Sequence, residues 1–93
     1  MRRIERATAF KRDYRKAKAI PRYRDLDGRL AAVLELLAND RPLPPRNHDH
    51  ALSANWSGYR DCHLWPDLVL IYAKPSPDLL RLARLGSHRD LFE

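Results

Sequence analysis

The run "LVLIYA", residues 68–73, is an unbroken apolar stretch that lies between two turn-forming sequences. An apolar run of this length, rich in branched and aromatic side chains, is typical of a strand buried on both faces of a sheet. The flanking sequences, Trp65-Pro66-Asp67 and Pro75-Ser76-Pro77-Asp78, contain the residue types that favour turns. We therefore predict that residues 68–73 form the central strand of a β-sheet, with a hairpin leading to each neighbouring strand.

The segments beyond the two turns supply those neighbouring strands. Residues 58–64 alternate with the period of two that a strand shows. One face of this predicted strand carries Tyr59, Asp61 and His63, and the other carries Arg60, Cys62 and Leu64. Residues 79–85 form a further predicted strand, which Gly86 ends, and the tail "SHRDLFE" follows. The second half of the chain thus predicts a small antiparallel sheet.

Two amphipathic helices are predicted in the first half, after a short strand over residues 2–7. Thr8 is the predicted N-cap of the first helix, whose apolar positions are Ala7, Phe10, Tyr14 and Ala17. Pro21 ends that helix, because proline lacks the amide hydrogen that a helix needs. The second helix ends near Asn39, before "RPLPP", and its apolar stripe consists of Leu26, Leu30, Val33, Leu34 and Leu37.

The apolar faces of the two helices need a surface to cover, and the predicted sheet offers one. We therefore expect an α+β fold in which an N-terminal strand and a helical hairpin pack on a small antiparallel β-sheet. The 93 residues, 44% of them hydrophobic, suit one domain spanning residues 1–93. No apolar run approaches the roughly 20 residues needed to span a bilayer, so we expect no membrane contact. The single cysteine, Cys62, excludes an internal disulfide and fits the cytoplasm, where we place the protein.

Positive charge is concentrated in the first half of the chain. The net charge is +6, and residues 1–46 carry thirteen Lys and Arg against six Asp and Glu, whereas residues 47–93 carry five against six. A positive field attracts polyanions or an acidic protein. Solubility alone is the simpler explanation, but for a small chain with a pI of about 10.0 we favour a nucleic-acid or acidic-protein partner.

Titratable side chains gather between Arg46 and Asp67, a stretch that holds three of the four histidines. His50, His63, Asp67 and the fourth histidine, His88, lie at the ends of predicted elements, where sites are usually built. Ordinary polar surface, a metal site and a set of general acids and bases are the three interpretations. No HExxH helix or CxxC pair supports a metal, and strand alternation directs Cys62 toward the core, which argues against nucleophilic catalysis.

General acid–base chemistry is the interpretation that we favour. Imidazole titrates at about pH 6.5 and therefore exchanges protons near neutrality. Cleavage of RNA by its own 2′-hydroxyl needs a base on that hydroxyl, an acid on the departing 5′-oxygen and positive charge at the phosphate, but no metal. Histidines, an aspartate and arginines near an aromatic side chain meet these needs. The sequence contains the acids, bases and positive charges that this reaction needs, but it does not distinguish this reaction from others that need the same groups.

Two segments of the chain resemble a known family. "DHALSANWSGYRDCHLWPDLVLIY", residues 49–72, and "LLRLARLGSHRDLF", residues 79–92, are similar to the YafQ branch of the RelE/ParE toxins. These are ribosome-dependent mRNA interferases of bacterial toxin–antitoxin pairs. The combination W-x-G-Y-R-D-x-H-x-x-P-D is specific, whereas the first forty-five residues match only in their pattern of elements. The resemblance implies a RelE-like toxin domain.

The resemblance also implies a site. It implies catalytic roles for His50, Asp61, His63, Asp67 and His88, with His88 as the proton donor. It implies RNA contacts for Arg60, Arg81, Arg84 and Phe92, the last of these holding the mRNA base. No cofactor and no metal are expected. The implied partners are mRNA in the ribosomal decoding site and a cognate acidic antitoxin, and operator DNA would be bound only through that antitoxin.

Two departures from the family pattern and one alternative stay open. The family often has tryptophan where this chain has Leu68, so a stacking surface is either missing or supplied by Trp65. His48 has no counterpart, and we interpret it as a surface residue. The alternative function is that of a ParE-like toxin, which is not a nuclease and binds protein through the same fold. An RNA-cleaving toxin needs an imidazole acid, so the histidine set favours the nuclease.

Overall fold

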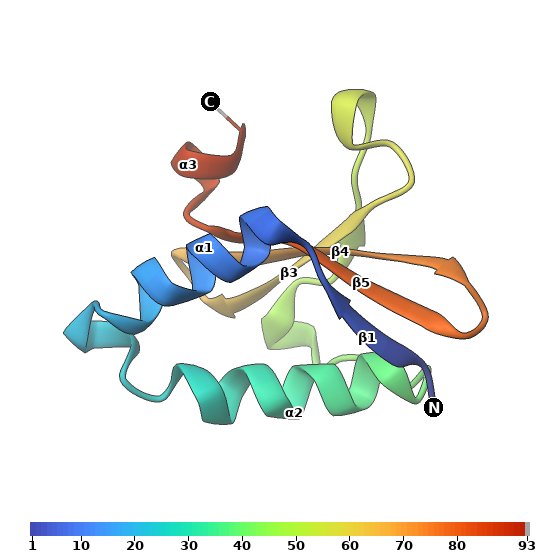
Figure 1. The fold of residues 1–93 in the computed structure, drawn as a ribbon, viewed down its shortest axis with the longest axis horizontal. Coiled ribbons are helices and arrows are strands. Elements are labelled where there is room, and N and C mark those ends of the chain that lie inside the picture. Colours follow the sequence, from blue (N-terminus) through green and yellow to red (C-terminus); the bar gives the residue numbers. More distant parts are fainter. Residues whose placement is uncertain (93) are drawn as a thin grey trace.

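The computed structural model describes residues 1–92, which form a five-stranded sheet with two longer helices packed on one face (Figure 1). The strands are β1 (Arg3–Arg6), β2 (His50–Ala51), β3 (Arg60–Trp65), β4 (Leu68–Ser76) and β5 (Leu79–Gly86). The helices are α1 (Thr8–Lys18), α2 (Leu26–Ala38) and α3 (His88–Phe92). The strand order across the sheet is β1-β5-β4-β3-β2. This arrangement confirms the predicted α+β fold.

Strand β4 lies at the centre of the sheet, as its apolar run predicts. Residues 68–73 are all buried, and β4 pairs antiparallel with β3 on one side and with β5 on the other. Leu70 and Tyr72 belong to the core between the sheet and the two longer helices, whereas Val69 and Ile71 belong to a second, smaller core on the opposite face. Burial on both faces explains why this strand has no polar alternation.

Strand β1 joins the edge of the sheet in a way that the sequence pattern does not reveal. It pairs with β5 in parallel, with Arg3 opposite Leu79 and Arg6 opposite Leu82. The antiparallel pairing predicted for the second half holds from β2 to β5. The sheet as a whole is therefore mixed, with one parallel edge strand.

The two longer helices follow the predicted apolar stripes, with one correction at a terminus. Helix α1 begins at Thr8 itself, with Ala7 at the N-cap position and no side-chain cap, so the predicted Thr8 cap is wrong. Phe10 and Ala17 face the core, and the apolar stripe of α2 is buried from Leu26 to Leu37. In residues 1–92, no helix combines the length and apolarity that a membrane span requires.

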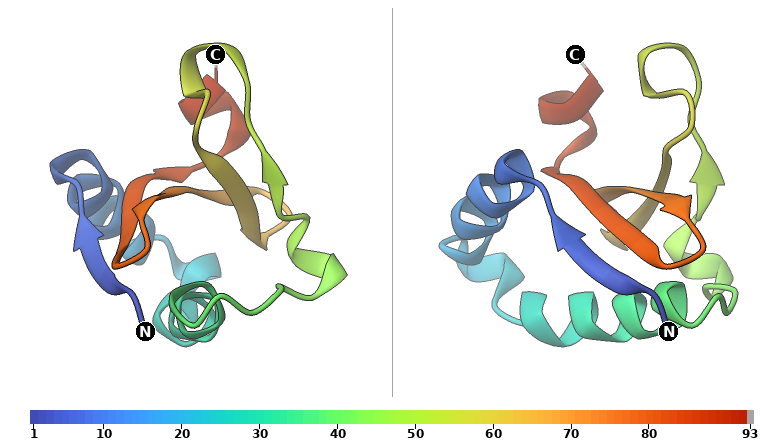
Figure 2. Two further views of the ribbon diagram at one scale, coloured as in Figure 1. Left: turned by 90° about the vertical axis from the view of Figure 1, so that its right-hand side faces the viewer. Right: turned by 45° about the vertical axis from the view of Figure 1, so that its right-hand side comes forward.

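The tail after β5, which we left without a regular element, forms helix α3 and folds back over the sheet. Leu91 packs with Val69, Ile71 and Ala83 on the face opposite the longer helices. Gly86 permits this close return, because a Cβ at that position would lie 3.3 Å from the Leu91 side chain. Helix α3 and the segment between β2 and β3 both rise on the side away from α2 (Figure 2). We call the face of the sheet opposite α1 and α2, which carries the smaller core, the open face.

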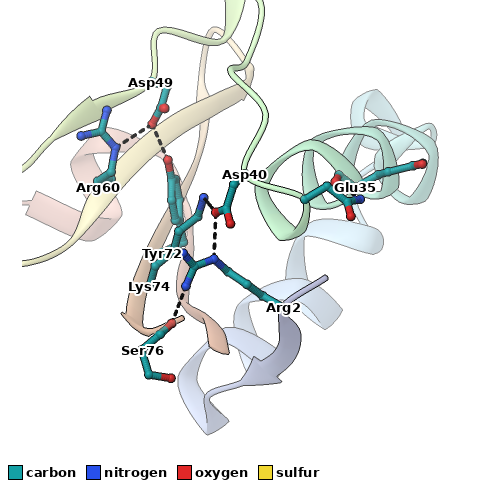
Figure 3. Close-up of polar contacts among 9 residues, drawn as sticks. Arg2, Glu35, Asp40, Asp49, Arg60, Tyr72, Lys74 and Ser76 are labelled. Carbon is teal, nitrogen blue, oxygen red and sulfur yellow. Dashed lines mark hydrogen bonds and ion pairs between the residues drawn. The ribbon is translucent and has the colours of Figure 1, made fainter. Parts of the chain in front are cut away.

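An aspartate beyond the end of α2 ties three parts of the chain together (Figure 3). Asp40 accepts hydrogen bonds from Lys74 Nζ at 2.7 Å and from Arg2 Nε at 2.8 Å. These two cations lower the pKa of Asp40 to about 2. Arg2 also donates to the carbonyl oxygen of Ser76. The N-terminus, the end of α2 and the end of β4 are thereby held together.

Candidate active site

Three imidazoles from separate segments lie next to one another. His63 is on β3, His88 is the first residue of α3, and His48 precedes β2. The ring centroid of His63 lies 5.5 Å from that of His48 and 5.7 Å from that of His88. We call these three residues the histidine row. The fold of α3 back over the sheet is what brings His88 to His63.

Two members of the histidine row, His88 and His63, have further specific contacts. The ring of Phe92 lies 4.9 Å from that of His88, one turn away on α3, and both side chains are exposed. Nδ1 of His63 lies 3.2 Å from the carbonyl oxygen of Pro66. With its proton on Nδ1, His63 donates to that carbonyl, and its Nε2 is left as a proton acceptor.

His50 and Asp61 form a pair beside the row. They are opposite each other on β2 and β3, and Nδ1 of His50 lies 3.0 Å from Oδ1 of Asp61. The same nitrogen lies 2.9 Å from the carbonyl oxygen of His48, which has the geometry of a hydrogen-bond acceptor. The carboxylate of Asp61 is thus close to an imidazole but accepts no geometrically good hydrogen bond.

Asp61, the partner of His50, is a carboxylate whose burial is unfavourable. Its side chain is fully buried, and this burial raises the pKa of the carboxyl group. His50, His63 and His88 oppose that shift through their charge. All three imidazoles therefore act on the same carboxylate, and the site holds a group that costs folding free energy.

We expect Asp61→Asn to make the folded protein more stable at pH 8. The carboxyl has a raised folded-state pKa, so its charge opposes folding once the pH exceeds that value. Removing an unpaired buried charge should add about 1–2 kcal/mol, or roughly 4–16 °C in the midpoint of thermal unfolding. The gain should decline as the pH falls from the raised folded-state pKa toward 3.8, the ordinary pKa of the group, and should be lost below it, because both states are then neutral. Thermal melts of the two proteins from pH 3 to pH 8 provide the measurement, and a loss of stability at pH 8 would contradict the expectation.

Asp67 lies in the turn between β3 and β4 and has partners from the helical layer. Its carboxylate forms an ion pair with Arg22 at 2.7 Å. Burial raises the pKa of Tyr23, and the hydrogen bond between Tyr23 and Asp67 raises it further. His63 contacts this turn through the carbonyl of Pro66. The catalytic role of Asp67 stays a prediction. In the structure its carboxylate contacts Arg22, which lies between α1 and α2.

The three arginines expected to contact RNA are each paired with a carboxylate. Strand alternation places Arg60 on the helix side of β3, where its Nε lies 3.2 Å from Asp49. Arg81 Nε lies 2.5 Å from Glu5, and Arg84 Nε lies 2.6 Å from Asp13. Their RNA contacts stay predictions, and binding a phosphate would require each arginine to share or exchange its present partner.

Leu68, one of the two departures from the family pattern, and Trp65, its proposed substitute, both pack in or against the core on the helix side of the sheet. Leu68 is buried in the core on the helix side. Trp65 is half-buried, with the Arg29 guanidinium 4.1 Å above its ring. Trp65 lines a cavity of about 490 Å³ together with His48 and His63. This shared cavity favours Trp65 as the substitute aromatic surface.

His48 lies next to the candidate site, although it has no counterpart in the family pattern. It is exposed, as expected of a surface residue, yet its ring is a member of the histidine row. The spacing H-D-H was the available signal, because it places a second imidazole two residues from His50. Among residues 1–92, no three His, Cys, Asp or Glu side chains are arranged to hold a metal ion.

The comparison with protein families identifies the class of protein that carries this fold and site. Residues 2–93 match the model of a family described as "Bacterial toxin of type II toxin-antitoxin system, YafQ". The chain therefore belongs to the YafQ toxin family, as the sequence motifs predicted.

Individual relatives cover nearly the whole chain. The mRNA interferase toxin YafQ of Escherichia coli strain B/BL21-DE3 is 40% identical over 89 residues, which are 96% of this chain and 94% of that protein. The crystal structure of the E. coli DinJ–YafQ complex contains a chain that superposes with a TM-score of 0.84 at 39% identity, with full coverage of both chains. A metal-bound toxin from Helicobacter pylori superposes with a TM-score of 0.83 at 38% identity, covering 99% of this chain and 100% of that one.

Proposed function

We propose that this toxin is an endoribonuclease that cleaves mRNA in the ribosomal decoding site by metal-independent general acid–base catalysis. The observation that carries the proposal is the contact of His50 with the buried carboxylate of Asp61 on β3, the strand from which His63 lies against His88. The naming of a relative 40% identical to this chain as an mRNA interferase supports the same reaction. A toxin that only binds protein has no use for three imidazoles around one carboxylate.

The proposed reaction divides proton transfer between two imidazoles. His50 directs Nδ1 at the carbonyl of His48 and beside Asp61, which leaves Nε2 to accept the proton of the 2′-hydroxyl. The 2′-oxygen then bonds to phosphorus as the bond from phosphorus to the 5′-oxygen breaks. His88 donates a proton to that departing oxygen, and His63, whose ring lies 5.7 Å from that of His88, stabilises the phosphate charge.

Contacts with the RNA would extend from this centre. Phe92 lies against His88 and is exposed, so it offers a ring on which the base at the cleaved position can stack. Arg81 pairs with Glu5, and the neighbouring Tyr59 packs against the smaller core under the open face. Arg81 would contact a phosphate of the neighbouring nucleotide, while Arg60 and Arg84 would have to leave Asp49 and Asp13 to do so.

Removal of metal ions should leave the cleavage rate unchanged. Every proton transfer in the proposed reaction is assigned to an imidazole, and none requires a metal-bound water. Cleavage of an mRNA programmed into purified ribosomes should therefore be the same after the toxin has been treated with EDTA and exchanged back into magnesium buffer, which keeps the ribosomes intact. Loss of activity that returns with one equivalent of zinc or copper would contradict metal-independent catalysis and link this chain to the metal-bound relative from H. pylori.

An acidic antitoxin is the proposed protein partner, and the helical layer offers it a binding surface. A groove of about 590 Å³ lies between α1 and α2. Its floor includes Phe10, Leu30 and Leu34, and its rim carries Lys11 and Arg15. An amphipathic helix with apolar anchors and acidic flanks would match both features. The E. coli relative solved in complex with DinJ supports a partner of this kind.

Expression in a bacterial host tests the whole proposal. We expect the chain alone to arrest growth and to cause cleavage of translated mRNA but not of mRNA kept free of ribosomes. Co-expression of the neighbouring gene, expected to encode a small protein with a DNA-binding N-terminus and an acidic C-terminus, should restore growth. Growth arrest with intact mRNA would instead favour the ParE-like alternative, and harmless expression would contradict the toxin function.

A further inference from the structure

The segment that carries His50 is attached to the sheet on both sides of His48. Asn47 is buried and donates Nδ2 to the carbonyl oxygen of His63 at 2.7 Å. Asp49 accepts a hydrogen bond from the Tyr72 hydroxyl at 2.5 Å and another from Arg60 Nε at 3.2 Å (Figure 3). The donors to Asp49 belong to β3 and β4. Hydrogen bonds at Asn47 and at Asp49 therefore attach residues 47–49 to strands β3 and β4.

The residue between the two attachments has a strained backbone. His48 has φ 47° and ψ 46°, the left-handed conformation, which costs about 1 kcal/mol for a residue with a Cβ. This conformation is accompanied by the contact of the His48 carbonyl oxygen with Nδ1 of His50 at 2.9 Å. Strain of this kind persists only where the surroundings hold the backbone in place. The attachments at Asn47 and Asp49 are the groups that do so.

Strand β2 alone offers His50 little support. It is two residues long, it lies at the edge of the sheet, and both of its residues are exposed. By contrast, Tyr72 is 1% exposed and belongs to the larger core. Burial and the bond to Asp49 raise the pKa of the Tyr72 hydroxyl, which therefore remains a hydrogen-bond donor at neutral pH. Asp49 thus connects a short, exposed edge segment to a fully buried side chain of the larger core.

We propose that Asp49 is a positioning residue, whose carboxylate fixes the orientation and tautomer of His50 by way of the His48 backbone. Its partners Tyr72 and Arg60 lie on the helix side of the sheet, while the imidazole that it positions lies beside Asp61. This inference rests on the proposed role of His50 as the base. It assigns Arg60 to the support of the site, in addition to the RNA contact predicted for it.

The tautomer of His50 tests the proposal directly. Long-range nitrogen–proton NMR spectra at pH 8 should show His50 of the unaltered protein with its proton mainly on Nδ1. In Asp49→Ala, the two tautomers of His50 should mix as in a free imidazole, while the signals of His63 and His88 keep their positions. The turnover number on ribosome-bound mRNA should fall about 10- to 100-fold, with KM within about twofold, because the base is misplaced while binding is retained.

Two further variants separate the hydrogen bonds of Asp49 from its charge. Asp49→Asn keeps an acceptor oxygen for Tyr72 and should restore most of the Nδ1 tautomer. Tyr72→Phe keeps the charge of Asp49 but removes its strongest donor, so it should shift His50 in the same direction as Asp49→Ala. These two variants also carry the test if Asp49→Ala does not fold.

Asp40→Asn is the matched control, because Asp40 is likewise an aspartate that accepts hydrogen bonds from two side chains but lies away from the histidine row. It should leave both the His50 tautomer and the turnover number unchanged. A folded Asp49→Ala protein with an unchanged His50 tautomer overturns the proposal, whether or not cleavage is lost. The spectra remain decisive even if the chain cuts no RNA, so failure of the proposed nuclease function would be recognised separately.

Discussion

Replacement of His88 by alanine is expected to slow mRNA cleavage about 10²- to 10⁴-fold, the usual contribution of a general acid. His88 begins α3, and its imidazole is exposed between Phe92 and His63. No other exposed imidazole of the described chain lies against the Phe92 ring. The alanine variant therefore loses the proton donor next to the surface on which the base is proposed to stack.

The same substitution should leave the fold intact, which makes the loss of rate interpretable. Leu91, not His88, attaches α3 to the smaller core. Single-turnover cleavage on ribosomes gives the rate, and the midpoint of thermal unfolding reports the fold. Arg89→Ala, an exposed neighbour on the same helix, is the matched control and should cleave at the normal rate. A His88→Ala protein that still arrests growth fully at equal expression would exclude His88 as the acid.

Asp13→Ala is expected to cost about 2–3 kcal/mol of folding free energy, the largest loss we anticipate from a single polar substitution. Asp13 lies on α1 and is nearly buried. Its Oδ2 accepts Arg84 Nε at 2.6 Å and the backbone amide of Leu85 at 3.0 Å, and its Oδ1 accepts a second guanidinium nitrogen of Arg84 at 3.3 Å. Removing the carboxylate leaves both a buried amide and a guanidinium without their partner.

Asp13 contributes this much folding free energy because it takes the place of a strand partner beyond the end of β1. Strand β1 pairs with β5 only as far as Leu82, so the next part of the β5 edge depends on Asp13 for a hydrogen-bond acceptor. A fully buried pair loses roughly 3–5 kcal/mol when one partner is removed, and we expect less because about a quarter of the Arg84 side chain is exposed. The thermal midpoint should fall by on the order of 10 °C.

Urea unfolding of Asp13→Ala, Asp13→Asn and Asp27→Ala measures this effect. Asparagine keeps one acceptor and should lose less stability than alanine. Asp27 pairs with Lys18 on the exposed surface, so its removal should leave the midpoint nearly unchanged. If Asp13→Ala is as stable as the parent protein, Arg84 is free to serve the RNA contact that the family resemblance implies.

The sequence was sufficient for the centre of the fold because short-range patterns define it. The apolar run of residues 68–73 and the turns around it depend on neighbouring residues, and they appear as predicted. Part of the candidate site could also be predicted, since His50, His63 and His88 lie at element ends, and the structure places His50 beside Asp61 and His63 beside His88. Titratable side chains gathered in a local motif can be recognised before the structure is known.

Contacts between distant residues were not readable. Arg84 and Asp13 are 71 positions apart, and Arg81 and Glu5 are 76 apart, so nothing local indicates that these arginines have carboxylate partners. The parallel pairing of β1 depends on the path of the chain through two helices, which a strand pattern does not contain. Helix α3 escaped prediction because five residues are too few to show a helical period.

The pairing of β1 with β5 also affects when a newly made chain reaches its final form. Residues 3–6 have no strand partner until residues 79–82 have been synthesised. Contacts between such distant segments form slowly, because the entropy of closing the intervening chain must be overcome first. His88 follows β5 and is added later still. The nascent toxin therefore passes through most of its own translation without the assembled candidate site.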